Sequence, residues 1–183
     1  MGMIQAFDEA FIRFVYENIQ GGFLDGVVTF VTKLGDGGML WIAITLILII
    51  ACIKNARLRR VALSCALALA LSGLFCNLIL KPMVMRTRPY DLMEIELMVE
   101  RLSDYSFPSG HTSAAFAFAS ALWLNNRKFG WVAIVAAAIM ALTRLYLCVH
   151  FPTDVLAGVM LGFICGLIGF NIAKRFIKNK ETA

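Results

Sequence analysis

The first stretch of the chain that could do chemistry is residues 81–89, which carries two cations at a regular spacing. Lys81 and Arg88 are seven residues apart, close to two helical turns, so an unbroken helix would place both on one face. Pro82 argues against an unbroken helix at this point. The stretch nevertheless offers two fixed positive charges that could hold an anionic group.

A second stretch, residues 108–111, has the sequence Pro-Ser-Gly-His and directly precedes an apolar run. Proline suits the first turn of a helix, and the free backbone N–H groups there attract anions. Ser109 adds a hydroxyl, and Gly110 would let a phosphate approach the backbone closely. This stretch therefore predicts a helix start that binds an anion, with His111 beside it.

The third stretch, residues 143–154, carries the second histidine of the chain. Arg144, His150 and Asp154 are separated by five and then three residues. Pro152 interrupts the regular backbone between them, and Thr153 or Asp154 can cap the helix that follows.

Together the three stretches supply three cations, one helix start, two imidazoles and one carboxylate, a set that suits phosphoryl transfer. The cations and N–H groups would neutralise charge on the phosphoryl oxygens, a task that Mg²⁺ performs elsewhere, so the reaction needs no metal ion. One histidine can attack phosphorus and the other can protonate the leaving oxygen. The carboxylate can fix the tautomer of the attacking histidine. The spacing alone leaves open which histidine has which role.

The composition places these stretches in a membrane protein. Of 183 residues, 60% are hydrophobic and 16% are charged, against about 45–50% and about 25% in soluble domains. So short a soluble chain could not bury that much apolar surface. This excludes a disordered chain and a cytosolic enzyme. The five cysteines lack CxxC spacing and read as small hydrophobes, Cys52 included, which excludes a disulfide scaffold and leaves too few ligands for a zinc cluster.

The hydrophobic pattern predicts an all-α integral membrane bundle of five to six transmembrane helices, in a single domain over 1–183. Residues 4–19 read as an amphipathic helix for the membrane surface, with Asp8 on its polar face. Residues 23–34 form a short apolar piece before a glycine-rich break at 35–38, so residues 1–38 are expected to be interfacial. Whether residues 4–34 cross the membrane stays open. The catalytic core, 39–175, contains apolar runs at about 39–53, 61–80, 112–124, 131–149 and 155–173.

Positive charge predicts the orientation of this bundle. If the loop from Lys54 to residue 60 is cytoplasmic, so are 125–130 and the C-terminal tail, which places ten of the 17 basic residues inside. The basic excess is then topological rather than a sign of nucleic-acid binding. All three chemical stretches fall on the extracytoplasmic side, where ionisable groups at membrane depth indicate function.

The three motifs, Lys-x6-Arg-Pro, Pro-Ser-Gly-His and (Ser/Thr)-Arg-x5-His-x3-Asp, closely resemble those of the type 2 phosphatidic acid phosphatase family. That family is similar in fold and site to the vanadium haloperoxidases. The resemblance covers residues 81–154 in order. The chain departs from the family at Thr143, where Ser is usual, but it keeps a hydroxyl group.

The resemblance implies His150 as the nucleophile that forms a phosphohistidine, Asp154 as its orienting carboxylate and His111 as the general acid. The residues that would hold the phosphate are Lys81, Arg88, Ser109, Gly110 and Arg144. The implied function is a cell-membrane lipid phosphatase without cofactor or metal. Its partners would be the bilayer and a phosphorylated lipid: undecaprenyl pyrophosphate, phosphatidylglycerophosphate or phosphatidic acid.

Two other functions stay open at this stage. A transporter or flippase could use the same cations to bind a phosphorylated head group, although it would not need two histidines beside a carboxylate. A haloperoxidase could hold vanadate as cofactor, but the membrane-embedded chain argues against it.

Several features fall outside the motifs. Arg86 and Arg101 match none and are interpreted as ordinary surface residues. The acidic segment 91–104 is expected to be solvated, with gating of the site as the alternative. Gly158, Gly162 and Gly166 predict close helix packing within the monomer.

Overall fold

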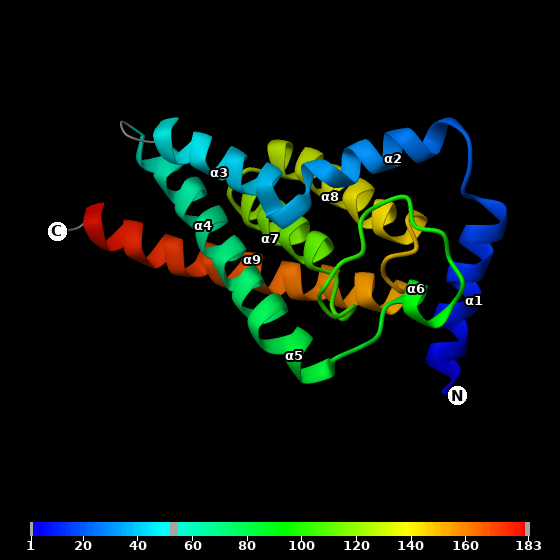
Figure 1. Ribbon diagram of the computed structural model, residues 1–183. Helices are drawn as coiled ribbons and strands as arrows, with labels where there is room; N and C mark the ends of the chain where they lie inside the picture. The colour runs from blue at the N-terminus through cyan, green and yellow to red at the C-terminus, as the bar shows by residue number, and fades with distance from the viewer. Residues whose placement is uncertain (1, 52–54, 182–183) are drawn as a thin grey trace.

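The computed structural model describes residues 2–51 and 55–181, and this part of the chain folds into helices without a strand (Figure 1). Cys52 and Lys54 lie outside the described residues. The elements in chain order are α1 (Met3–Asn18), α2 (Phe23–Leu34), the short turn η1 (Asp36–Gly38), α3 (Met39–Ala51), α4 (Ala56–Gly73), the π-helical η3 (Leu74–Leu80), α5 (Lys81–Val84), α6 (Pro89–Leu92), α7 (Gly110–Asn125), α8 (Arg127–Tyr146) and α9 (Pro152–Glu181).

The predicted all-helical membrane bundle is confirmed, but fewer helices are long enough to span than expected. Within the described ranges, Leu58–Leu92, Arg127–Tyr146 and Pro152–Ile177 are long and apolar enough to cross a membrane. The pair Phe23–Leu34 and Asp36–Ala51, bent by 42°, would make a fourth span. The expected five to six spans are thus only roughly matched, because α3 and α7 have 13 and 16 residues, against about 20 for a full crossing.

Helix α7 occupies the centre of the bundle and packs against α4, α8 and α9. Small residues allow the closest of these contacts. A Cβ atom added at Gly158, Gly162 or Gly166 of α9 would lie 2.8, 2.7 or 1.9 Å from atoms of the chain between Ser109 and Ala121. The prediction that this glycine stripe packs within the monomer is confirmed, and it brings the start of α7 against the start of α9.

The helix that carries Lys81 ends earlier than an unbroken pattern would require. The π-helical turn of η3 precedes Pro82, whose missing N–H breaks the regular hydrogen-bond ladder. Helix α5 stops at Val84, and Met85 has a left-handed φ of 48°. Arg88 therefore lies in extended backbone after a reversal of the chain, not on the same helix face as Lys81.

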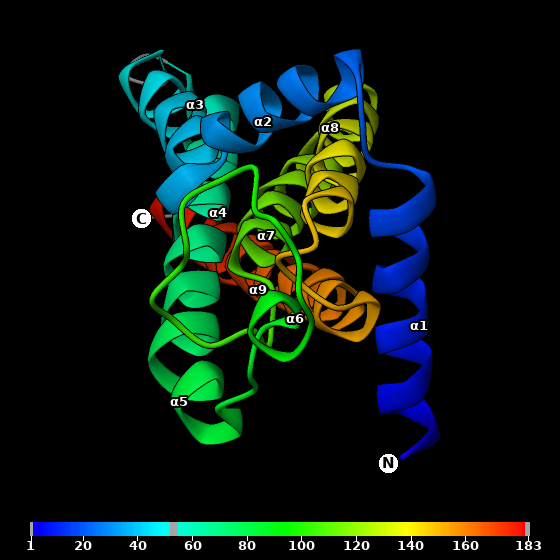
Figure 2. The ribbon, with the colours of Figure 1, turned by 45° about the vertical axis from the view of Figure 1, so that its right-hand side comes forward.

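Helix α1 lies at the edge of the molecule, beside α8 and α9 (Figure 2). Its apolar residues Ile4, Phe7 and Phe14 are exposed, as in a helix that faces lipid. Its inner face buries Ile12 together with Asp8, which is fully buried. The expectation that Asp8 lies on a solvated polar face was therefore wrong.

Candidate active site

A cavity of about 1030 Å³ opens at one end of the bundle, between η1, η3, the loop after α6 and the start of α7. Figure 1 shows this end opposite the starts of α4 and α8 and the end of α9. Six of the eight residues singled out in the sequence line the cavity, namely Lys81, Arg88, Gly110, His111, Arg144 and His150. Ser109 and Asp154 are fully buried just behind its wall.

Two of the cations converge on one carboxylate. Lys81 and Arg88 are buried, and both form ion pairs with Asp104, which is half exposed. Arg88 Nη2 donates to Asp104 Oδ1 at 2.6 Å, while Lys81 Nζ contacts Oδ2. Partial burial raises the pKa of Asp104, but Lys81 and Arg88 outweigh this and lower it to about 2. The two cations are thus arranged to bind a pair of oxyanion oxygens.

The third cation, Arg144, comes from the last turn of α8 and is almost completely buried. Its Nη1 contacts the hydroxyl of Thr32 in α2. Its Nε has no acceptor among the described residues, although the atom is buried. Because an unpaired buried guanidinium nitrogen is costly, this group fits a site that takes an anionic ligand.

The start of α7 supplies the Pro-Ser-Gly-His residues. The helix begins at Gly110, and Ser109 is its N-cap residue. A Cβ atom at Gly110 would lie 3.9 Å from Lys81 Nζ, which shows how near the backbone runs to this cation. Nε2 of His111 lies 2.9 Å from Oδ1 of Asp36 in η1. The helix start, Lys81 and His111 therefore face one cavity.

His150 lies in the turn between α8 and α9 and is almost completely buried. Its Nε2 lies 3.3 Å from Arg88 Nη1. Its Nδ1 lies 3.7 Å from Asp154 Oδ2 and 3.5 Å from Ser106 Oγ. Burial, helped by the charges of Arg88 and Arg144, lowers the pKa of His150 to about 3 against the opposing effect of Asp154. The ring is therefore neutral near pH 7, and because a guanidinium can only donate, Nε2 carries the lone pair that accepts from Arg88.

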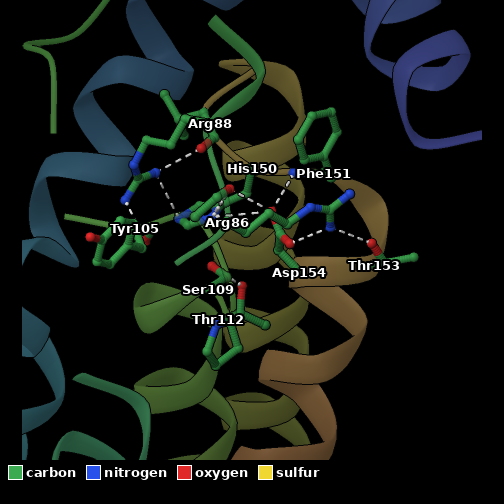
Figure 3. A network of polar contacts seen from close by, with 12 residues as sticks. Arg86, Arg88, Tyr105, Ser109, Thr112, His150, Phe151, Thr153 and Asp154 are labelled. Atoms are coloured by element: carbon green, nitrogen blue, oxygen red, sulfur yellow. Dashed lines mark hydrogen bonds and ion pairs between the residues drawn. The ribbon is translucent and has the colours of Figure 1, made fainter. Parts of the chain in front are cut away.

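Asp154 is held by donors on both of its oxygens (Figure 3). Ser106 donates its hydroxyl to Oδ2 at 2.6 Å, and the Phe151 N–H donates to the same oxygen at 2.9 Å. The second bond resembles half of a capping box, in which a residue of the first turn accepts from the residue before the helix. Arg86 donates to Oδ1 at 2.6 Å.

Four residues of this network carried no sequence signal for a role here. Arg86 was interpreted as a surface residue, which was wrong, because its side chain is 18% exposed and contacts Asp154. Asp104 lies in the segment expected to be solvated and is half exposed, but its ion pairs with Lys81 and Arg88 were not predicted. Ser106 and Asp36 belong to no motif that identified them. For Ser106, its position two residues before the Pro-Ser-Gly-His motif was a usable hint.

Comparisons with known proteins identify the family to which this bundle is similar. The family model described as "PAP2 superfamily" matches residues 61–178. Undecaprenyl-diphosphatase BcrC of Bacillus subtilis is 27% identical over 151 residues, which cover 82% of this chain and 75% of the relative. Lipid A 4'-phosphatase of Bacteroides thetaiotaomicron is 31% identical over 160 residues, or 80% of this chain and 68% of that one.

A solved structure shows the same architecture. The crystal structure of the first transmembrane PAP2 type phosphatidylglycerolphosphate phosphatase from Bacillus subtilis matches with a TM-score of 0.79 and 25% sequence identity. The match covers 96% of this chain and 88% of the other.

The helical bundle and its cationic cavity define a membrane lipid phosphatase. The chain belongs to the PAP2 superfamily. The prediction of a hydrolase is thereby confirmed.

Proposed function

We propose that the protein hydrolyses a phosphate or pyrophosphate group on a lipid through a phosphohistidine on His150. The observation that carries this proposal is the set of contacts made by the two ring nitrogens of His150. Nε2 of His150 lies beside Arg88 at the cavity, and Nδ1 lies beside Asp154. A histidine nucleophile needs this arrangement, with an unprotonated nitrogen at the cavity and the other nitrogen near a carboxylate.

In the first step the Nε2 lone pair attacks phosphorus, and the bond from phosphorus to the leaving oxygen breaks. His111 gives its proton to that oxygen, and Asp36 supports the protonated ring at 2.9 Å. The Nδ1 proton of His150 points towards Asp154 and Ser106, which stabilise the charge that the ring gains. The product of this step is the phosphohistidine and a lipid with a free hydroxyl or one phosphate fewer.

In the second step His111 accepts a proton from water, whose oxygen attacks phosphorus and breaks the N–P bond. Inorganic phosphate leaves, and His150 is neutral again. Lys81, Arg88 and Arg144 balance the phosphoryl charge in both steps.

The lining of the cavity supports a lipid substrate. Besides the polar groups, Ile42 of α3 and Leu69 of α4 line it, so a head group at the cations would have its chain against apolar side chains. Two relatives are named as phosphatases of undecaprenyl diphosphate and of lipid A. Among the candidate lipids, we propose undecaprenyl pyrophosphate as the preferred substrate of this chain.

The orientation belongs to the same proposal. The cavity faces the extracytoplasmic side, where undecaprenyl pyrophosphate is left after glycan transfer. Basic residues at the opposite end, such as Arg59, Lys128 and Lys174, support a cytoplasmic position for that end. Labelling of E96C and K128C in intact cells tests this, since both positions are exposed. E96C alone should react from outside, and the reverse pattern would invert the topology.

Phosphate release from purified protein in nanodiscs tests the reaction. The panel comprises undecaprenyl pyrophosphate, phosphatidylglycerophosphate, phosphatidic acid and lipid A, each with EDTA present. We expect release that H150A abolishes and vanadate inhibits, with the highest kcat/KM for undecaprenyl pyrophosphate. Full activity of H150A, or activity lost in EDTA, would contradict the mechanism. A higher kcat/KM for another lipid would contradict the substrate.

A further inference from the structure

Arg86 joins the catalytic end of the bundle to helix α1 through a buried set of polar contacts. Its Nη1 donates to Asp154 Oδ1 at 2.6 Å and to Thr153 Oγ1 at 2.7 Å. Its Nη2 donates to Asp8 Oδ2 at 2.7 Å and to Gln5 Oε1 at 3.0 Å. One guanidinium thus spans two carboxylates that are 146 positions apart in the sequence.

Burial makes these contacts costly to change. The side chains of Asp8 and Asp154 are both fully buried, and that of Arg86 is 18% exposed. The guanidinium carbon also lies 4.2 Å from the centre of the Phe151 ring. A charge so far removed from water needs a partner, so each carboxylate depends on the shared cation.

We propose that Arg86 is a positioning residue for Asp154, and that Asp8 of α1 neutralises part of the charge of Arg86. This inference rests on the proposed function, because it concerns the carboxylate beside the nucleophile. Arg86 occupies Oδ1 of Asp154, which leaves Oδ2 turned towards His150 Nδ1 at 3.7 Å. Figure 3 shows Asp154 between the guanidinium and the ring.

The charges explain why two acidic residues share one arginine. An arginine paired with Asp154 alone would cancel the carboxylate that must support positive charge on His150. Asp8 forms an ion pair with the other terminal nitrogen of the same guanidinium, Nη2. The set of Asp8, Arg86 and Asp154 therefore keeps one net negative charge next to the ring.

The charged groups around His150 together determine how readily its ring takes up a proton. Asp8 from α1 and Arg86 from the segment before α6 act on Asp154, which faces His150. Arg88 and Arg144 oppose protonation of His150 from the cavity side. Removal of Arg86 should therefore favour a charged His150 ring and loosen Asp154, whereas removal of Asp8 should disfavour that charge.

The inference assigns a role to α1 as well. Thr153 at the start of α9 donates its backbone N–H to Asp8 Oδ1 at 3.2 Å, and its hydroxyl contacts Oδ2. Helix α1 thus holds the first turn of α9, which carries Asp154.

The test compares R86Q, R86K, D8N and the double variant R86Q/D8N with wild-type protein. R101Q is the matched control, because Arg101 is exposed, lies at the same end of the molecule and pairs with Asp91 outside the cavity. The double variant removes the cation together with one carboxylate, so it leaves no excess buried negative charge and should fold even where R86Q does not.

We expect R86Q and R86Q/D8N to lower kcat at least about tenfold, with KM and vanadate affinity within about threefold of wild type, because the three cavity cations are intact. R86K should recover part of kcat, and R101Q should match wild type. A second readout needs no turnover: the ¹⁵N-histidine NMR titration midpoint of His150 should rise in R86Q and fall in D8N, each by about half a unit or more, and should lie between the two in R86Q/D8N.

A folded double variant with wild-type kcat, or a His150 midpoint that neither R86Q nor D8N moves, would overturn the inference. A parallel loss of vanadate affinity would also overturn it, because that pattern indicates general damage to the site. If the wild-type protein releases no phosphate from any lipid, the proposed function fails, while the NMR midpoint still decides whether Arg86 acts on His150 through Asp154.

Discussion

Arg88 Nη2 donates to Asp104 Oδ1 at 2.6 Å, so the carboxylate of Asp104 forms an ion pair with a cation proposed to bind phosphate. Lys81 contacts the other oxygen of the same carboxylate. A phosphate that binds both cations must displace Asp104, which belongs to the loop between α6 and α7. If Lys81 and Arg88 hold the phosphate as proposed, Asp104 competes with the substrate for both cations.

The D104N variant should therefore bind phosphate more tightly. Loss of the negative charge removes a competing ion pair, so KM and the inhibition constant of inorganic phosphate should both fall severalfold, consistent with ~1 kcal/mol for a partly exposed pair. Steady-state kinetics with phosphate as inhibitor measures both constants. E94Q is the control, because Glu94 is exposed and lies outside the cavity. A rise of both constants in D104N would show that Asp104 helps substrate binding instead.

The Ser106 hydroxyl should matter for catalysis more than for binding. It donates to Asp154 Oδ2 at 2.6 Å and lies 3.5 Å from His150 Nδ1. In S106A the carboxylate loses one of its donors, and we expect kcat to fall roughly tenfold with KM little changed. T87A removes an exposed hydroxyl nearby and should behave as wild type. An S106A effect confined to KM would contradict this assignment.

His150 should stay neutral at pH values where an ordinary histidine is half protonated. Burial, Arg88 and Arg144 lower its pKa from 6.5 to about 3. Since the folded state resists this proton, the contribution of His150 to stability is complete above pH 6.5 and declines as the pH falls towards 3. The chain has two histidines, so ¹⁵N-histidine NMR of an H111N variant reports His150 alone. A midpoint near 6.5 would contradict the buried, neutral ring.

The packing of α9 on α7 should tolerate no added methyl group at Gly162. A Cβ atom there would lie 2.7 Å from Ser113 O, a backbone atom that cannot move aside cheaply. We expect G162A to destabilise the fold by about 1–3 kcal/mol, measured by thermal unfolding in detergent. G26A is the matched control, because a Cβ at Gly26 meets nothing within 4 Å. Equal stability of the two variants would show that the helices are less closely packed.

The sequence predicted the site as far as its motifs reach. Lys81, Arg88, His111, Arg144 and His150 stand in motifs whose internal spacing is local, and the structure brings all five to one cavity. The prediction for α7, 112–124, differs from the observed 110–125 by two residues at most. The number of spans is only roughly matched, because hydropathy marks apolar runs, whereas a crossing also needs length.

The partners of those residues could not be predicted, because each depends on the tertiary fold. Asp8 is one acidic residue of an amphipathic pattern, and only the packing of α1 beside α9 shows that it faces Arg86. Arg86 lies two residues before Arg88 but belongs to no motif, so no spacing in the sequence indicated a role for it. Its side chain reaches Asp154 just after the chain reverses at Met85, where φ is 48°.

The most direct measurement is the site of a covalent phosphoryl group during turnover. Protein mixed with undecaprenyl pyrophosphate and stopped in alkali, which preserves phosphohistidine, is digested and sequenced by mass spectrometry. The account predicts phosphate on His150, absent from H150A. Phosphate on another residue, or release of inorganic phosphate by H150A at the wild-type rate, would contradict it.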